Sequence, residues 1–168
     1  MATGSDIQQR LEEMRTALVK RGVAITPKRA KVLEILATSD EHPNVGDLHA
    51  EVQRWHPSTS LATVYNTIEL LKETGQVLEL EFSAAANRYD GRRPDSHPHL
   101  VCLECQRIDD LEVPEPEGIF EAIGAETGYE VVRQRLDYYG ICPNCQKKRE
   151  SRLSGQAGFV ALNDRANY

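Results

Sequence analysis

Two imidazoles and two thiols lie within nine residues in the stretch His97-Pro98-His99-Leu100-Val101-Cys102-Leu103-Glu104-Cys105. A second Cys-x-x-Cys pair follows in Cys142-Pro143-Asn144-Cys145, and these two pairs contain all four cysteines of the chain. One Cys-x-x-Cys pair spans the reach of one tetrahedral metal ion, so two pairs supply a complete thiolate set for structural zinc. The sequence therefore predicts a four-cysteine zinc site formed by Cys102, Cys105, Cys142 and Cys145.

The length of 168 residues allows one ordinary domain or two small ones, and 40% hydrophobic residues are enough for a core. A small domain is marginal on its own, and a bound metal would stabilise it. The N-terminus has no basic segment leading into an apolar run, and 18 apolar residues never occur together. We therefore expect a cytoplasmic protein with no membrane partner. In that reducing compartment Cys-x-x-Cys pairs are more often metal ligands than disulfides.

A net charge of −6 is unusual for a protein that binds nucleic acid. The segment 20–31, however, carries five cations and no acidic residue: Lys20, Arg21, Lys28, Arg29 and Lys31. Such a patch can contact phosphates while the remaining surface stays acidic. The alternative interpretation is a solvated run of charges with no ligand.

Apolar residues recur at three- and four-residue steps in four segments before residue 75, which predicts four amphipathic helices. The first spans about 6–21. Thr26 as N-cap and Pro27 at the first helical position start the second helix. The third spans about 45–55, with Val45, Leu48, Val52 and Trp55 expected on its inner face. Ser60 caps the fourth, with Leu61, Val64, Ile68 and Leu71 expected inside.

Polar side chains occupy the outer face of the fourth predicted helix: Thr63, Tyr65, Asn66, Thr67 and Glu69. Short strands are predicted at 77–82 and 87–89. Three helices, a polar-faced fourth helix and a hairpin indicate a winged helix-turn-helix, because hydroxyl, amide and phenol groups suit groove edges and phosphates. A helical bundle with an appended hairpin is the alternative.

The clearest break in composition, residues 91–96, predicts a hinge linker. Beyond it we expect strands at 100–102 and 107–111, a helix at 114–126 and a long strand at 129–139. The fold class is thus α+β, with an N-terminal winged helix and a small α/β domain closed by the cysteines. Residues after about 147 show no apolar period and are expected to form a mobile tail.

Five motifs, in this order, resemble those of the ferric uptake regulator family: Ile25-Thr26-Pro27-Lys28-Arg29, Ala62-Thr63-Val64-Tyr65-Asn66-Thr67, Asn87-Arg88-Tyr89-Asp90, His97 to Cys105, and Cys142 to Cys145. The resemblance implies a homodimeric, metal-dependent transcriptional repressor that binds double-stranded operator DNA and is not an enzyme. It implies a DNA-binding domain at 1–90, a hinge at 91–98, a dimerisation and zinc domain at 99–149 and a tail at 150–168.

Within that family, the pattern of the peroxide-sensing, PerR-like regulators falls on five residues: His42, Asp90, His97, His99 and Asp110. Iron-sensing relatives typically carry Glu at the two aspartate positions and Arg where Asn66 stands. The resemblance also implies DNA contacts from five residues: Lys28, Arg29, Thr63, Tyr65 and Asn66. Residues 132–135 lack the histidine that iron sensors often carry there, so a further regulatory metal site is not expected.

Three imidazoles and two carboxylates form a borderline-hard donor set suited to Fe(II) or Mn(II), whereas thiolates suit zinc. The resemblance implies that peroxide converts His42 and His97 to oxo-histidines in the iron-loaded protein, which then releases DNA. Two alternatives stay open from the sequence alone. One is a regulator of the same family that senses iron or zinc concentration. The other is a metalloenzyme using His97, His99 and Asp110, although no general base accompanies them.

Overall fold

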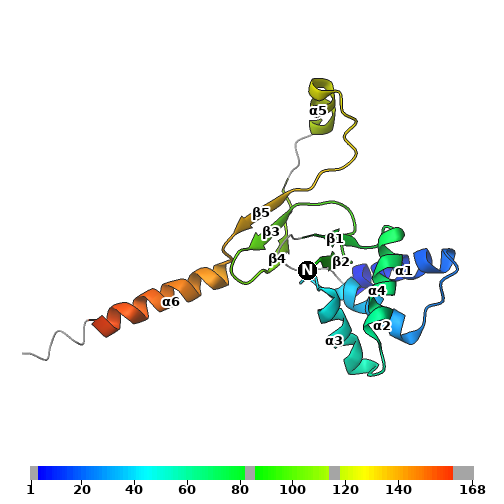
Figure 1. The fold of residues 1–168 in the computed structure, drawn as a ribbon, viewed down its shortest axis with the longest axis horizontal. Helices are drawn as coiled ribbons and strands as arrows, with labels where there is room; N and C mark the ends of the chain where they lie inside the picture. Colours follow the sequence, from blue (N-terminus) through cyan, green and yellow to red (C-terminus); the bar gives the residue numbers. More distant parts are fainter. Residues whose placement is uncertain (1–3, 82–85, 114–117, 161–168) are drawn as a thin grey trace, which may run out of the picture. The chain divides into compact units, whose positions relative to one another are not determined.

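The computed structural model describes residues 4–81, 86–113 and 118–160, with side chains described as far as residue 152. The chain divides into two compact units, residues 1–97 and residues 98–168. Each unit has its own elements, labelled in Figure 1. No helix among the described residues is long and apolar enough to cross a membrane.

Four helices form the first unit: α1 (Gly4–Lys20), α2 (Pro27–Thr38), α3 (Val45–Trp55) and α4 (Leu61–Glu73). Their starts follow from local capping. The Thr26 side chain accepts a hydrogen bond from the Arg29 N–H, and Ser60 accepts one from the Thr63 N–H, as predicted. Asn44 and Asp47 complete a capping box at the start of α3, which fixes where the preceding loop ends.

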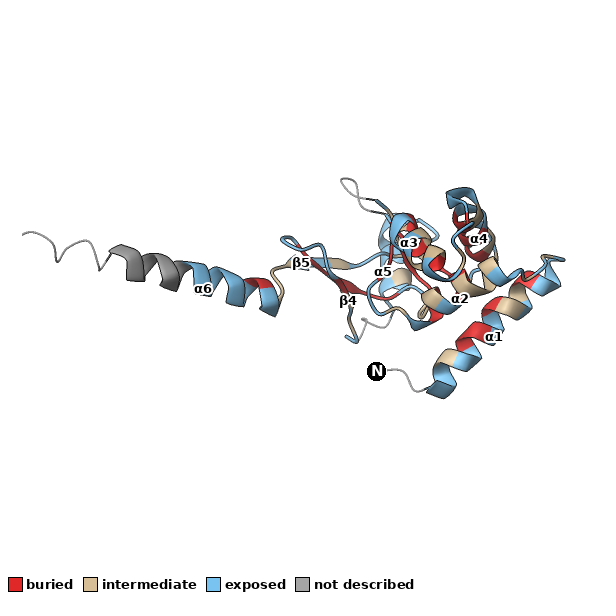
Figure 2. Ribbon diagram, turned by 90° about the horizontal axis from the view of Figure 1, so that it is seen from below, coloured by how far each residue is buried: buried red, intermediate tan, exposed pale blue. Residues whose placement is uncertain are grey.

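The wing of the first unit is an antiparallel hairpin of β1 (Leu78–Leu80) and β2 (Arg88–Asp90), in which Leu78 pairs with Asp90. The core below it is continuous and consists of fifteen buried residues: Leu11, Met14, Leu18, Val32, Leu33, Leu36, Ala37, Val45, Leu48, Val52, Val64, Ile68, Leu71, Val77 and Tyr89. Figure 2 shows the buried stripe along α1 that contributes to it. This unit therefore holds its hairpin on an ordinary hydrophobic core.

Three positions of the predicted helix faces are wrong. Trp55 is 64% exposed because the buried stripe of α3 ends at Val52, and the ring instead lies beneath the Lys31 ammonium, 4.2 Å away. Leu61, the first residue of α4, is 44% exposed. Thr67 is fully buried, because its hydroxyl donates to the Thr63 carbonyl oxygen at 2.7 Å and is satisfied within the helix.

The second unit contains a three-stranded sheet of order β4-β3-β5. Strand β3 (His99–Cys102) pairs antiparallel with β4 (Ile108–Asp110) and parallel with β5 (Asp137–Gly140). Helix α5 (Ile119–Thr127) buries none of its residues. Helix α6 (Pro143–Val160) leaves the cysteine-rich end of the sheet (Figure 1).

The structure corrects one prediction for the second unit and adds secondary structure to another segment. The long strand predicted at 129–139 is replaced by β5, because the ladder follows the four residues of β3 and ends with them. The tail predicted from residue 150 starts within a helix, because α6 extends to Val160. Pro143 begins α6 and residues with good helix propensity follow it. An apolar period is missing in residues 143–152 of α6 because most of these residues are exposed, as Figure 2 shows. Residues 161–168 lie outside the described residues.

Candidate functional site

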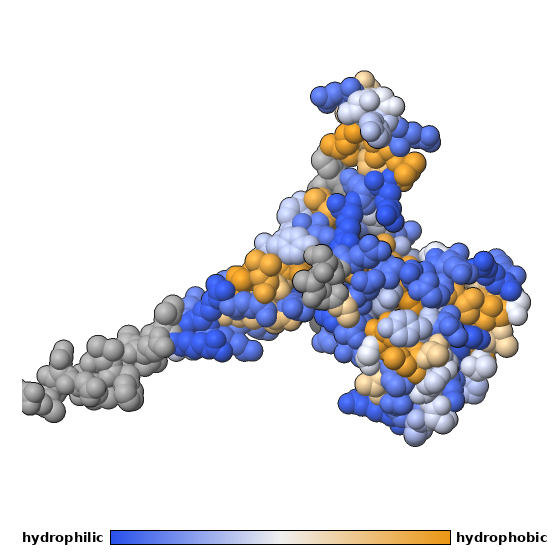
Figure 3. Space-filling model, viewed as in Figure 1, coloured by the Kyte–Doolittle hydropathy of each residue, from blue (hydrophilic) through white to orange (hydrophobic). Residues whose placement is uncertain are grey.

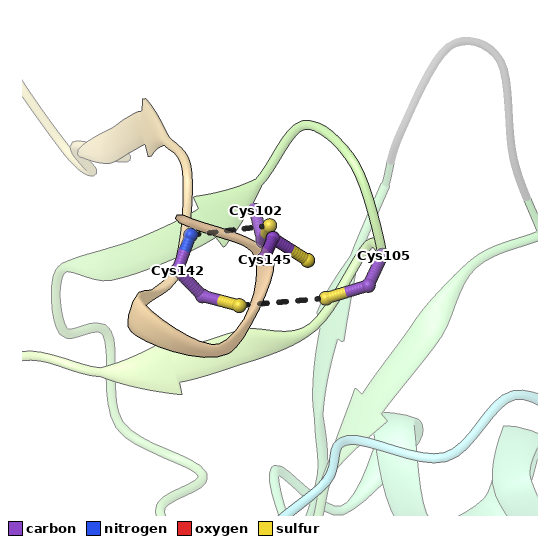
Figure 4. A group of neighbouring side chains, drawn as sticks. All are labelled: Cys102, Cys105, Cys142 and Cys145. Carbon is purple, nitrogen blue, oxygen red and sulfur yellow. Dashed lines mark hydrogen bonds between the residues drawn. The ribbon is translucent and has the colours of Figure 1, made fainter. Parts of the chain in front are cut away.

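The four cysteines meet at one end of the sheet of the second unit (Figure 4). Cys102 ends β3, Cys105 lies in the turn before β4, and Cys142 and Cys145 lie at the start of α6. Their sulfur atoms are all within 4.8 Å of one another, and the Cys105 and Cys142 Sγ atoms are 3.8 Å apart. Tetrahedral zinc with Zn–S bonds of about 2.3 Å has sulfur–sulfur edges of about 3.8 Å. The cysteines are free thiols, spaced for a shared ion rather than for disulfides.

Backbone groups prepare this site for anionic sulfur. The N–H groups of Cys105 and Cys142 point at the Cys102 thiol and lower its pKa to about 6, and the Cys142 nitrogen lies 3.3 Å from Cys102 Sγ. Gln106 adopts a left-handed backbone with φ of 59°, which closes the turn by a hydrogen bond from its N–H to the Cys102 carbonyl oxygen. Burial, together with the neighbouring thiols, raises the pKa of Cys145. Four clustered sulfurs ionise together only around a cation, so the donor set fits zinc.

In the first unit, the Asp90 carboxylate lies between two imidazoles. Asp90 Oδ2 is 3.5 Å from His42 Nε2 and 3.4 Å from His97 Nε2, and all three residues are buried. The other carboxylate oxygen, Oδ1, accepts hydrogen bonds from the N–H groups of Arg92 and Arg93 at 2.8 and 2.9 Å. These bonds fix the carboxylate so that Oδ2 faces the imidazoles.

The backbone around these residues explains their placement. His42 has a left-handed backbone with φ of 49°, a conformation that costs a non-glycine residue about 1 kcal/mol or more and clusters at functional sites. The next residue, Pro43, accepts a hydrogen bond from the Tyr89 N–H, which ties the His42 loop to the wing beside Asp90. His97 Nδ1 lies 2.8 Å from the Asp95 carbonyl oxygen. Because a carbonyl oxygen can only accept a hydrogen bond, this contact favours the tautomer with the proton on Nδ1. The remaining nitrogen, Nε2, then carries the lone pair that can bind a metal.

Gly91 fixes the chain directly after Asp90. Its carbonyl oxygen accepts a hydrogen bond from Arg10 Nε at 2.7 Å, from the buried side of α1. A Cβ atom at Gly91 would meet Leu36 Cβ at 2.7 Å and Met14 Cε at 2.9 Å. The end of the wing is therefore pressed against the core, which limits how far Asp90 can move.

In the second unit, His99 and Asp110 are register partners in the antiparallel pair of β3 and β4. His99 Nε2 lies 4.0 Å from Asp110 Oδ1. On the other side of the ring, His99 Nδ1 lies 3.6 Å from Oδ1 of Asp137, a residue that the sequence did not single out. Asp137 is found only from the parallel register of β5 against β3, and the sequence alone does not give that register.

The predicted DNA contacts lie on α2 and α4 of the first unit. On α4, Tyr65 is 47% exposed, Asn66 is exposed and Thr63 is half-buried. Lys28 and Arg29, in the first turn of α2, are half-buried, and the Lys28 ammonium donates to the Ser58 carbonyl oxygen at 2.8 Å. Polar groups therefore line the exposed side of α4, in a helix-turn-helix followed by a hairpin wing.

A winged helix-turn-helix joined to a unit with a four-cysteine site defines the class of metal-binding DNA-binding regulators. The family model of the ferric uptake regulator family matches residues 20–139. This chain belongs to the ferric uptake regulator family.

Among its relatives, the peroxide operon regulator of Bacillus subtilis is 36% identical over 138 residues, covering 82% of this chain and 94% of that protein. The peroxide-responsive repressor PerR of Staphylococcus saprophyticus is 32% identical and covers 84% of this chain and 95% of that protein. Among solved structures, the peroxide stress regulator of Campylobacter jejuni matches with a TM-score of 0.60 at 31% identity, covering 80% of this chain and 98% of that one. The predictions of family and fold class are thereby confirmed.

Proposed function

We propose that this protein is a metal-dependent transcriptional repressor that senses hydrogen peroxide and releases operator DNA when its own histidines are oxidised. The observation that carries the proposal is Asp90 Oδ2. It is buried between His42 and His97 and has no hydrogen-bond partner among the described residues. A buried carboxylate oxygen without a partner is costly, and a cation bound there removes that cost.

Zinc in the four-cysteine site has an architectural role in this proposal. The four thiolates close the site with no position left for a substrate, as structural zinc sites do. By joining the end of β3 to the start of α6, they tie together segments that are distant in the sequence. The second unit then folds when zinc binds.

The regulatory metal, Fe(II) or Mn(II), is held in this proposal by His42, Asp90 and His97 of the first unit with His99 and Asp110 of the second. Three nitrogen and two oxygen donors suit these ions better than they suit zinc in a thiolate site. A ligand set drawn from both sides of the hinge at 91–98 links metal binding to the angle between the domains. Metal then favours the DNA-binding arrangement by the difference in its affinity for the two arrangements.

Peroxide sensing assigns distinct roles to the ligands. Fe(II), when held by these residues, would supply the electrons that reduce hydrogen peroxide and so would generate an oxidant at the site. His42 and His97 flank Asp90 and are the residues proposed to take up oxygen as oxo-histidines. An oxidised imidazole is a poorer metal ligand, so the set loses donors from the first unit. The protein then loses both the regulatory metal and its preference for the DNA-binding arrangement.

A homodimer places two α4 helices on operator DNA. Support comes from exposed apolar side chains of the second unit: Leu100, Leu103, Val113, Ile119, Ile123, Tyr129, Val132, Leu136, Tyr138 and Tyr139. Figure 3 shows apolar surface around α5 and along the sheet. A concentration of exposed apolar side chains is typical of a surface that contacts another protein, which supports the proposal. In the dimer, Tyr65, Lys28 and Arg29 are assigned to phosphates, and Thr63 and Asn66 to the groove.

The test is a mobility-shift titration of operator DNA, taken from the promoter of the gene itself, with zinc-containing protein. We expect Mn(II) or Fe(II) to tighten binding, and peroxide to abolish it in the Fe(II) sample alone. Asp90→Asn should remove the metal response, whereas Asp95→Asn, on the exposed loop, should keep it. A response to iron concentration that peroxide leaves unchanged would instead identify an iron-sensing regulator of the same family.

A further inference from the structure

We propose that Asp137 is a positioning residue for the metal ligand His99. Its carboxylate faces His99 Nδ1, favours the tautomer that carries the proton on this nitrogen, and so leaves Nε2 free to face Asp110 and the regulatory metal. This inference rests on the proposed function for the role of His99, and it adds a residue on a third strand to that site.

The sheet of the second unit brings the two residues together. His99 and Asp137 are register partners in the parallel pair of β3 and β5, so both side chains project from the same face. Asp137 Oδ1 lies 3.6 Å from His99 Nδ1, while Asp110 Oδ1 lies 4.0 Å from Nε2. The imidazole is thus placed between one carboxylate on each neighbouring strand.

Burial strengthens the electrostatic interaction between His99 and Asp137. The side chains of His99 and Asp137 are 2% and 10% exposed, so water screens them little. Asp137 Oδ1 is buried and has no hydrogen-bond partner among the described residues. The other oxygen, Oδ2, accepts a hydrogen bond from Arg135 Nε at 2.7 Å. Arg135 thereby holds the carboxylate in an orientation that turns Oδ1 toward His99.

The chemistry follows from the two tautomers of neutral imidazole. A carboxylate facing Nδ1 favours the tautomer with the proton on Nδ1, which leaves the lone pair on Nε2. A carboxylate acceptor also makes Nε2 a stronger ligand, and loss of such a partner commonly weakens metal binding by about 10- to 100-fold. Asp137 is not assigned as a ligand, because it faces the nitrogen opposite Asp110.

The chain offers a matched control on β4. Arg107 and Asp109 repeat the Arg-x-Asp pair of Arg135 and Asp137, with Arg107 Nε donating to Asp109 Oδ1 at 2.7 Å. Asp109, however, pairs in register with Leu100 and so projects from the face opposite His99. Asp109→Ala removes the same kind of ion pair from the same sheet without touching the imidazole.

The experiment uses the full-length, zinc-loaded protein and follows free Mn(II) by electron paramagnetic resonance during titration. Asp137→Ala should weaken Mn(II) binding about 10- to 100-fold and Asp137→Asn by a smaller factor, while Asp109→Ala stays within about twofold of wild type. Zinc per chain should be equal in all variants. Unchanged Mn(II) affinity in Asp137→Ala, or an equal loss in Asp109→Ala, would overturn the inference.

A second readout separates this inference from the proposed function. Long-range ¹H–¹⁵N spectra of the histidines, recorded without metal in the regulatory site, report the tautomer of His99. We expect Nδ1–H in wild type and in Asp109→Ala, and a shift toward Nε2–H in Asp137→Ala. Because this measurement needs no Mn(II), it tests Asp137 even if the wild-type protein fails to respond to the metal. An unchanged tautomer in Asp137→Ala would contradict the inference.

Discussion

The two units of the chain differ in how they exclude water. The first unit buries fifteen core residues from four helices and the wing. Among the described residues of the second unit, four apolar or thiol side chains are buried: Val101, Cys102, Ile108 and Cys145. A small unit with so little buried apolar surface needs another source of stability, and two of those four residues belong to the zinc set. The difference teaches that hydrophobic burial stabilises the first unit, whereas the second unit depends on other sources, which we propose to be zinc and a second subunit.

The largest effect is expected from removing zinc. Chelation, or Cys145→Ser, should unfold the second unit, because apparent zinc-binding free energies of about 10–16 kcal/mol contribute directly to the folding of such small units. Circular dichroism should show a loss of secondary structure, and hydrogen exchange should show a loss of protection in β3, β4 and β5 while α1 to α4 keep theirs. A zinc-free protein whose second unit stays protected would break the comparison between the two units.

The next effect concerns the subunit contact. Charges placed on α5 by Ile119→Asp with Ile123→Asp should weaken the dimer at least about tenfold, since a charge buried in an interface is strongly unfavourable. Val19→Asp is the matched control, because Val19 is also apolar and 59% exposed but belongs to the first unit. Sedimentation equilibrium measures both. Equal dissociation of the control would show that the exposed apolar surface of the second unit has no special role.

A third prediction compares the packing density of the two units by adding one methyl group to each. Gly91→Ala should lower the free energy of unfolding of the first unit by about 1–3 kcal/mol, because its Cβ would overlap Leu36. Gly140→Ala, in β5, should change stability by less than about 0.5 kcal/mol, since no atom lies within 4 Å of its added Cβ. Urea denaturation gives both values, and a tolerated Gly91→Ala would contradict the tight packing beside Asp90.

The smallest effect expected is a pH-dependent change in stability from Glu79, in strand β1 of the wing. Burial acts to raise the pKa of Glu79, but hydrogen bonds from Lys72, Asn87 and Tyr89 outweigh burial and hold that pKa below the ordinary value of 4.5. A lowered pKa contributes stability that is present above pH 4.5 and is lost as pH falls through the shifted value. Glu79→Gln should therefore cost about 1 kcal/mol at pH 7 and nothing in strong acid. A difference that persists unchanged in acid would assign the effect to packing instead.

The sequence predicted what depends on neighbours along the chain. Thr26 and Ser60 cap α2 and α4 as predicted, because a cap is formed within four residues. The pairing of strands that lie far apart in the sequence could not be predicted in this way. The strand predicted at 129–139 is too long, because the length of β5 is set by its pairing with β3, which lies far away in the sequence. The exposure of Trp55 could not be predicted either, since helical period does not show that the buried stripe of α3 ends at Val52.

The candidate sites divide in the same way. Spacing alone predicted the four cysteines, because a thiolate pair spans one ion. His42, Asp90 and Asp110 were predicted from the family resemblance, because they lie far apart in the sequence, whereas His97 and His99 also form a His-x-His pair that indicates a metal site by itself. The register of a parallel strand pair placed Asp137 beside His99, and no local pattern encodes that register.

The central claim is tested most directly by mass spectrometry of Fe(II)-loaded and Mn(II)-loaded protein treated with equal hydrogen peroxide, with operator binding measured on the same samples. We predict one added oxygen on peptides containing His42 or His97 in the Fe(II) sample, together with release of operator DNA. Neither change should occur with Mn(II). Release of DNA with no added oxygen on either peptide would contradict the proposal, and so would equal oxidation in both samples.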